Sequence, residues 1–136
     1  MLTVDSTTTL AVAGKYLDAV SAKDFATVAG LFAEDIVGHQ PGDNRLSGTH
    51  RGRAAVNEML GAMMAISEET LELATTGAPL VNDNMVAVPV QFSAQRDGAT
   101  LGQDGVDVLR IDVGRIAEVW LFSSDPHAED TFWGAR

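Results

Sequence analysis

The sequence predicts a single α+β domain over residues 1–136, with helices in its first half and an antiparallel meander in its second half. Apolar residues recur at the three-to-four spacing of helices in the first half, whereas from Thr70 onward they alternate with a period of two. Turn-forming triplets separate the alternating stretches. Helices followed by a meander make an α+β domain, and 136 residues are enough to build one core.

Composition and charge exclude several classes of partner and site. The chain is 46% hydrophobic and 21% charged, which is an ordinary globular balance. Its net charge of −10 argues against nucleic acid or an anionic membrane as a partner. The lack of cysteine excludes disulfides, zinc-thiolate sites and thiol nucleophiles. The opening MLTVDSTTTL lacks the basic start and apolar run of a signal peptide, so we expect a cytoplasmic protein.

Three helices are expected in the first half. The first has an apolar stripe and a cap supplied by residues 7–9; the stripe consists of Leu10, Ala13, Tyr16, Leu17 and Val20. The second spans DFATVAGLFAED, capped by Asp24, with an inner side made of Phe25, Val28, Leu31 and Phe32. The third spans GTHRGRAAVNEMLGAMMAI, with one face made of Val56, Leu60, Met63 and Met64.

Strands follow, separated by the turn signals NDN (82–84), RDG (96–98) and DVG (112–114). One face of the first long strand carries Val86, Val88, Val90 and Phe92. The next strand carries Asp107, Leu109 and Ile111 on one face and Val106, Val108 and Arg110 on the other. The last sets Ala117, Val119, Leu121 and Ser123 against Ile116, Glu118, Trp120 and Phe122. Both faces are substantially apolar, so we expect helices to cover one face and a second copy, in a homodimer, to cover the other.

The chemistry-bearing residues are few. Asp107 is either a desolvated acid kept protonated as a hydrogen-bond donor or a solvated surface residue, and its pattern leaves both open. Tyr16 is the only tyrosine, and its pattern favours a core residue over a catalytic one. The histidines His39, His50 and His127 lack metal-ligand spacing, so neither a metal nor another cofactor is expected.

Three stretches resemble the SnoaL-like branch of the NTF2-like superfamily: HQPGDNRLSGTHRGRAAV, VDVLRIDVGRIAEVW and DPHAEDTFWG. The layout is similar to that of ketosteroid isomerases over nearly the whole chain. This resemblance implies a curved antiparallel sheet wrapped by about three N-terminal helices around a conical pocket. Such motifs specify the fold better than the reaction.

The resemblance also assigns positions. Tyr16 falls on the oxyanion-hole tyrosine of the isomerases, and Asp107 on their aspartic acid, which an apolar site keeps neutral. Gln40 falls on their general-base aspartate, but an amide cannot carry a proton between carbons. Phe32 and Leu60 fall on two supporting tyrosines. Half of the isomerase machinery is therefore expected here, without the group that moves the proton.

Other branches of the superfamily supply no base either. The arginine and two aspartates of limonene epoxide hydrolase-like enzymes fall on Val88, Val90 and Leu121, and the acid of the SnoaL-like cyclases falls near Leu121. His39 is the remaining titratable candidate. Neighbouring side chains of a strand point to opposite faces, so His39 joins Gln40 in the pocket only if the turn at residues 40–42 distorts the strand.

We expect a mostly apolar pocket whose polar groups are Tyr16, Asp107 and Gln40. Its other lining residues are expected to be Phe32, Met59, Leu60, Met63, Met64, Val88, Val90, Phe92, Leu109, Val119 and Leu121. The ligand should be a hydrophobic small molecule with a carbonyl or hydroxyl, such as a polyketide, terpenoid or steroid-like ring system. Two functions stay open: an isomerase, cyclase or dehydratase with an unidentified base, and a non-catalytic binding protein that keeps the pocket alone.

Overall fold

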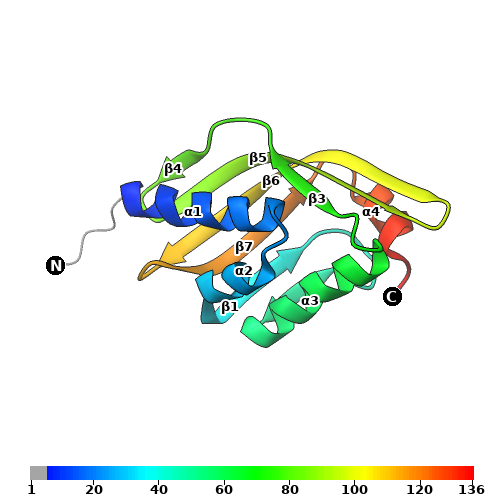
Figure 1. Ribbon diagram of the computed structural model, residues 1–136, viewed down its shortest axis with the longest axis horizontal. Helices are drawn as coiled ribbons and strands as arrows, with labels where there is room; N and C mark the ends of the chain where they lie inside the picture. The colour runs from blue at the N-terminus through cyan, green and yellow to red at the C-terminus, as the bar shows by residue number, and fades with distance from the viewer. Residues whose placement is uncertain (1–5) are drawn as a thin grey trace.

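The computed structural model describes residues 6–136. The first five residues of the stretch MLTVDSTTTL, from which a cytoplasmic protein was expected, lie outside it. The α+β class is confirmed (Figure 1). The helices are α1 (Ser6–Ser21), α2 (Phe25–Leu31), α3 (Arg53–Ile66) and α4 (Pro126–Trp133). The strands are β1 (Phe32–Gln40), β2 (Gly48–Arg51), β3 (Glu72–Thr75), β4 (Leu80–Asn82), β5 (Met85–Arg96), β6 (Ala99–Asp112) and β7 (Arg115–Ser123).

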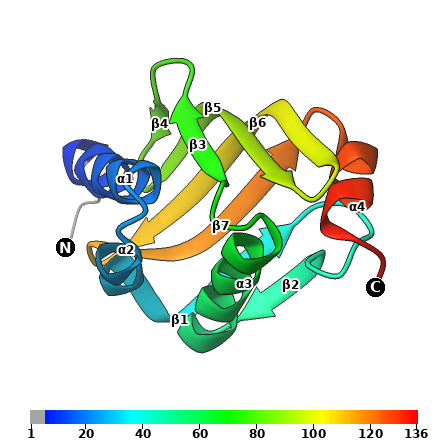
Figure 2. The same cartoon turned by 45° about the vertical axis from the view of Figure 1, so that its right-hand side comes forward.

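The strands form one curved, unclosed sheet in the order β2-β1-β7-β6-β5-β3, with β4 paired to β5. Only the β1–β7 pair is parallel among the pairs of residues 6–136. Figure 2 shows α1, α2 and α3 on the same side of the curved sheet, and α4 at one end of it. The expected wrapping of the sheet by N-terminal helices is therefore confirmed.

The helix boundaries differ from the expected ones in three places. Because α1 already begins at Ser6, residues 7–9 lie inside the helix and do not cap it. Asp24 does cap α2, accepting a hydrogen bond from the Thr27 amide, but this helix ends at Leu31 and not at residue 35. The chain from Phe32 pairs with β7 instead, and this sheet pairing overrides the helical pattern.

The third expected helix loses its first residues to a strand. Residues 48–51 form β2, which pairs antiparallel with the end of β1, so α3 starts only at Arg53. Gly52 separates the two elements with a φ of 94°, a conformation that glycine adopts without steric cost. The pattern of apolar residues did not distinguish this short edge strand from a helix.

The meander has the expected turns and one unexpected bulge. Strands β5, β6 and β7 are consecutive antiparallel neighbours, joined at residues 97–98 and 113–114. Their register shifts by one residue between Arg110 and Ile111, so that Ile111 faces Ile116. This shift turns Ile116 into the core, where it is fully buried, although the alternating pattern assigned it to the outer face.

Helix α4 was not expected from the sequence. Its start carries an ordinary signal, because the Asp125 side chain accepts from the Ala128 amide and Pro126 follows directly. Phe132 and Trp133 are buried, and they hold the helix against the end of the sheet. Among residues 6–136, no helix is long and apolar enough to span a membrane.

Candidate functional site

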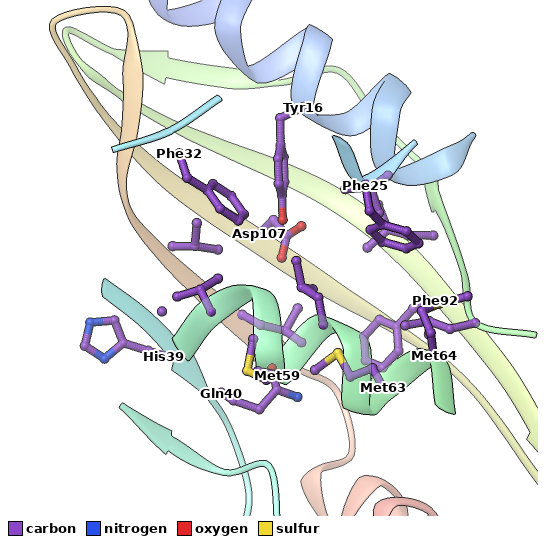
Figure 3. A pocket seen from close by; sticks show the side chains of 18 of the residues that line it. Tyr16, Phe25, Phe32, His39, Gln40, Met59, Met63, Met64, Phe92 and Asp107 are labelled. Atoms are coloured by element: carbon purple, nitrogen blue, oxygen red, sulfur yellow. The ribbon is translucent and has the colours of Figure 1, made fainter. Parts of the chain in front are cut away.

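A cavity lies between the inner face of the sheet and the helices (Figure 3). Its wall combines residues from all four helices with residues from strands β1, β3, β5, β6 and β7. The space open to the centre of a water-sized molecule is about 100 Å³, against the 10–15 Å³ or so that one water needs. The cavity is thus a binding-sized space and not a packing defect.

Most residues expected in the pocket border this cavity. They are Tyr16, Phe32, Gln40, Met59, Leu60, Met63, Met64, Phe92, Asp107, Val119 and Leu121. Val88, Val90 and Leu109 are a correction: they point inward but are fully buried in the core and do not line the cavity. Helix α1 packs against β5 and β6, the strands that carry these three residues.

Tyr16 and Asp107 lie together in the interior. Tyr16 comes from the inner side of α1 and Asp107 from β6, where it pairs with Val88 and Leu121 in the adjacent strands. In Figure 3 the Tyr16 hydroxyl points at the Asp107 carboxyl group. Asp107 is only 4% exposed, so the solvated alternative left open by its pattern is wrong.

The electrostatics of this pair follow from burial. Desolvation raises the pKa of Asp107 to about 7, because burial penalises the charged carboxylate. Burial also raises the pKa of Tyr16 above its ordinary value, and the nearby Asp107 charge raises it further. Among residues 6–136, no hydrogen bond to the Asp107 carboxyl group counteracts the rise of its pKa. In their neutral forms, both groups can donate a hydrogen bond to a ligand.

Gln40 borders the cavity on the side away from the Tyr16 hydroxyl (Figure 3). Its side chain is buried, and its Nε2 atom donates to Oε1 of Glu129 over 3.3 Å. Glu129 itself comes from α4 and also borders the cavity. The position where the resemblance puts an isomerase base thus holds an amide that touches a carboxylate.

Glu129 is the residue that sequence reasoning missed. It is fully buried and also receives hydrogen bonds from Ser123 Oγ and from Trp133 Nε1, the latter at 3.2 Å. Burial raises its pKa above the ordinary value, while the hydrogen bonds of Ser123 and Trp133 act against that rise. A signal was present, since Glu129, Phe132 and Trp133 are spaced to share one face of a capped helix.

His39 borders the cavity, but its side chain is engaged on the other side of β1. Its imidazole points away from the cavity (Figure 3), stacks on Trp120 at 5.3 Å and lies 2.6 Å from Oε2 of Glu118. Residues 37–40 pair with β2 in unbroken register, so the strand has no bulge up to Gln40. Alternation therefore holds, with Gln40 inward and His39 outward.

No metal centre is visible in the part of the chain that the structure describes. Within residues 6–136, no three or more histidine, aspartate and glutamate side chains are grouped so that they could hold an ion. The residues with polar groups that line the cavity instead supply one phenol, one amide, two carboxyl groups, one imidazole and one indole N–H. This set can donate hydrogen bonds and exchange protons.

Comparison with known proteins agrees with this architecture. Residues 13–119 match the SnoaL-like domain family. A protein of unknown function with a cystatin-like fold from Xanthomonas campestris is 44% identical, with a TM-score of 0.89 over 93% of this chain and 98% of that chain. An NTF2-like protein from Burkholderia xenovorans is 21% identical, with a TM-score of 0.74 over 96% and 99% of the two chains.

A third solved structure, from Kribbella flavida, is named as a proposed ketosteroid isomerase. It is 24% identical, with a TM-score of 0.70 over 90% of this chain and 82% of that chain. At this identity the likeness extends to the fold alone. The family match identifies the chain: it belongs to the SnoaL-like domain family.

Proposed function

We propose that this protein is a small-molecule enzyme of the ketosteroid isomerase and SnoaL-like type, an isomerase, cyclase or dehydratase. Its substrate is a hydrophobic molecule with a carbonyl or hydroxyl oxygen, such as a polyketide, terpenoid or steroid-like ring system. Tyr16 and Asp107 donate hydrogen bonds to that oxygen. The observation that carries this proposal is the buried pair itself, a phenol and a carboxyl group that meet at the cavity.

The pair supports a catalytic role because both groups are buried at the edge of the cavity. A buried hydroxyl or carboxyl normally finds a hydrogen-bond partner, and no hydrogen bond from residues 6–136 contributes to the pKa of Asp107. A ligand oxygen placed between the two groups would satisfy both. In a low-dielectric site, two such donors stabilise developing negative charge on an enolate oxygen.

The rest of the cavity supports a bulky apolar substrate. Aromatic and aliphatic side chains dominate its wall, and Met59, Met63 and Met64 lie along one helix, α3. Methionine side chains are flexible and polarizable, so this side of the wall is able to reshape around an irregular ring system. A few polar groups in an apolar wall are typical of small-molecule sites.

The test is the binding of 2-naphthol, whose oxygen imitates that of an enolate, measured by fluorescence titration. Asp107→Asn keeps a donor and should bind nearly as tightly as the wild type. Asp107→Leu removes the donor and should lose roughly 1–3 kcal/mol of binding free energy, because the ligand oxygen is left without its partner. A matched control is Asp104→Leu, an exposed position of the same strand. Equal affinity of the wild type and Asp107→Leu would refute the donor role.

One observation favours a second candidate function. Gln40 stands where the resemblance puts the isomerase base, and an amide has no useful basicity near neutral pH. A non-catalytic protein that binds hydrophobic ligands would need no base there. Tight 2-naphthol binding without turnover of any enolisable ketone in a panel of polyketides, terpenoids and steroids would favour this alternative.

We also propose that the protein is a homodimer built on the outer face of the sheet. Phe122 is 56% exposed on that face, and its neighbours Val106, Val108 and Trp120 are only half-buried. Large apolar side chains gathered on one open face are typical of a surface that is covered in the assembly.

Light scattering at micromolar concentration should give twice the chain mass of 14.4 kDa. Phe122→Asp should yield monomers, because it places a charge in the contact. Val113→Asp is the matched control, since Val113 is 92% exposed at the turn between β6 and β7 and should leave the dimer intact. A wild-type protein that stays at the single-chain mass would rule out this interface.

A further inference from the structure

Glu129 is a buried acid that the donor pair of the proposed mechanism leaves unused. It has no solvent-exposed surface, although it borders the cavity. Within residues 6–136, no lysine, arginine or histidine lies within ion-pair distance of its carboxyl group. A buried carboxylate without a cation is costly to keep. An acid maintained under such conditions is a candidate for chemistry.

The surroundings of Glu129 are arranged to hold a carboxylate. Its Oε1 atom accepts from Gln40 Nε2 at 3.3 Å and from Trp133 Nε1 at 3.2 Å, and its Oε2 atom accepts from Ser123 Oγ. All of these donors are neutral, so they stabilise the charged form without cancelling its basicity by an ion pair. They also fix the orientation of the carboxyl plane.

Glu129 retains room for one further partner. A carboxylate offers about four acceptor positions, and within residues 6–136 Oε2 receives a hydrogen bond only from Ser123. Because Glu129 is among the residues that line the cavity, a ligand bound there would meet this remaining position. A proton-bearing carbon of that ligand is what this acceptor would meet.

We propose that Glu129 is the general base of this site, delivered from α4 and held in place by Gln40, Trp133 and Ser123. This inference rests on the proposed function, and it supplies the proton-transfer group that strand β1 lacks at position 40. Gln40 is then a positioning residue: its amide orients the carboxylate instead of moving the proton.

The step is balanced without any oxidant or cofactor. Glu129 takes a proton from the carbon next to the substrate carbonyl, so the carbon–hydrogen bond breaks and its electron pair enters an enolate. Tyr16 and Asp107 donate to the enolate oxygen. Glu129 then returns the same proton to another carbon of the conjugated system, which gives an isomerised ketone and the original carboxylate.

Other charged groups near Glu129 come from the elements around it. Asp130 is its neighbour on α4, and its charge also raises the Glu129 pKa. Asp107 reaches the same cavity from β6. At the end of α4, Arg45 and Arg96 donate to the carbonyls of Trp133 and Phe132. Because Glu129 must be charged and Asp107 neutral, the rate should rise with the ionisation of Glu129 and fall with that of Asp107.

The test measures proton abstraction directly. Wild-type protein should accelerate the exchange of the α-protons of 2-tetralone for deuterium in D₂O, which proton NMR measures as loss of the α-proton signal. Glu129→Gln keeps the size of the side chain and removes the base, so exchange should fall by about 10²–10⁴-fold, the usual contribution of a positioned base. Its affinity for 2-naphthol should change by less than about threefold, since that ligand reports on the donor pair. Glu58→Gln, on an exposed position of α3, is the matched control.

The outcomes separate this inference from the proposed function. If 2-naphthol binds and Glu129→Gln exchanges 2-tetralone as fast as the wild type, Glu129 is not the base and the donor pair stands. If 2-naphthol binds and the wild type gives no exchange above the buffer rate, Glu129 is not a base and the binding-protein alternative gains. If 2-naphthol does not bind, the proposed function itself fails.

A second variant decides the matter even if Glu129→Gln does not fold. Ser123→Ala removes one donor from the carboxylate, so the pKa of Glu129 should rise further. The rising limb of the exchange rate against pH should move to higher pH, while the falling limb set by Asp107 stays in place. A purely structural role for Glu129 predicts that neither limb moves, and that result would overturn the proposal.

Discussion

The pKa values of acidic side chains shift in opposite directions on the two sides of the sheet. On the outer face, Glu118 of β7 lies 2.6 Å from His39 Nε2 and 3.3 Å from Arg110 Nη2. Burial pushes the pKa of Glu118 upward, but the hydrogen bonds and charges of these two partners outweigh it and lower the pKa. On the inner side, Asp107 and Glu129 have no cation within ion-pair distance among residues 6–136, and burial raises the pKa of both.

The comparison teaches which acids are built for stability and which are available for chemistry. The charge of the Glu118 carboxylate is compensated by its pairing with His39 and Arg110, which favours the ionised form. Its oxygens are therefore already engaged and not available to a ligand. Asp107 and Glu129 both stay uncompensated, but they differ from each other. Burial alone shifts the pKa of Asp107, which favours the neutral acid. Glu129 instead accepts hydrogen bonds from Gln40 and Trp133, which favour its carboxylate. Acids with such divergent surroundings are suited to opposite roles in one reaction.

The largest expected effect is on the pH dependence of stability at Asp107. Its pKa is about 7 in the folded protein against 3.8 when exposed. Between these values the unfolded chain loses the proton and the folded protein keeps it, so stability falls as pH rises through this window. Asp107→Asn removes the titrating group. The variant should gain roughly 3 kcal/mol relative to wild type between pH 5 and pH 8, because a gain of about 1.4 kcal/mol per pH unit accumulates only up to the folded-state pKa of about 7.

Urea unfolding at the two pH values measures this difference. Asp104→Asn is the control, because that residue is exposed on the same strand and meets water in both states. Its stability relative to wild type should not change between the two pH values. If Asp107→Asn behaves like this control, the inner face does not desolvate Asp107, and the contrast between the two faces disappears.

Much of the fold was predictable because its strands are long and regularly patterned. In β5 the inward residues Val86, Val88 and Val90 are all buried, as their alternation predicts. Prediction failed where pairing with distant strands decides the conformation. Residues 32–35 continue a helical pattern but pair within the sheet, and the bulge that turns Ile116 inward depends on its register against β6. Local periodicity carries no information about such pairings.

The site was predictable to a smaller degree. Asp107 shares its face with Leu109 and Ile111, so its inward position followed from the pattern once the face was known to be interior. Glu129 could not be placed in this way. It lies in an eight-residue helix, and its contact with Gln40 joins positions 89 residues apart in the chain. Only the packing of α4 against the sheet brings the two together, and the sequence alone does not specify that packing.

A smaller effect of opposite sign is expected on the outer face. Because the pKa of Glu118 is lowered in the folded protein, its pairing with His39 and Arg110 stabilises the fold above the ordinary glutamate value of 4.5. This contribution is lost as pH falls through the lowered value. Glu118→Gln removes the charge from a partly exposed cluster, so it should cost about 0.2–1 kcal/mol at pH 7 and less at pH 3.

Urea unfolding of Glu118→Gln at pH 3 and pH 7 completes the comparison with Asp107→Asn. Relative to wild type, the inner-face variant should improve as pH rises, whereas the outer-face variant should become worse. The 2-tetralone exchange rate should be the same in Glu118→Gln and wild type, because the His39 and Glu118 side chains interact on the side of β1 away from the cavity. If the outer-face change instead slows exchange tenfold or more, the two faces are coupled. Charge compensation would then no longer separate structural acids from reactive ones.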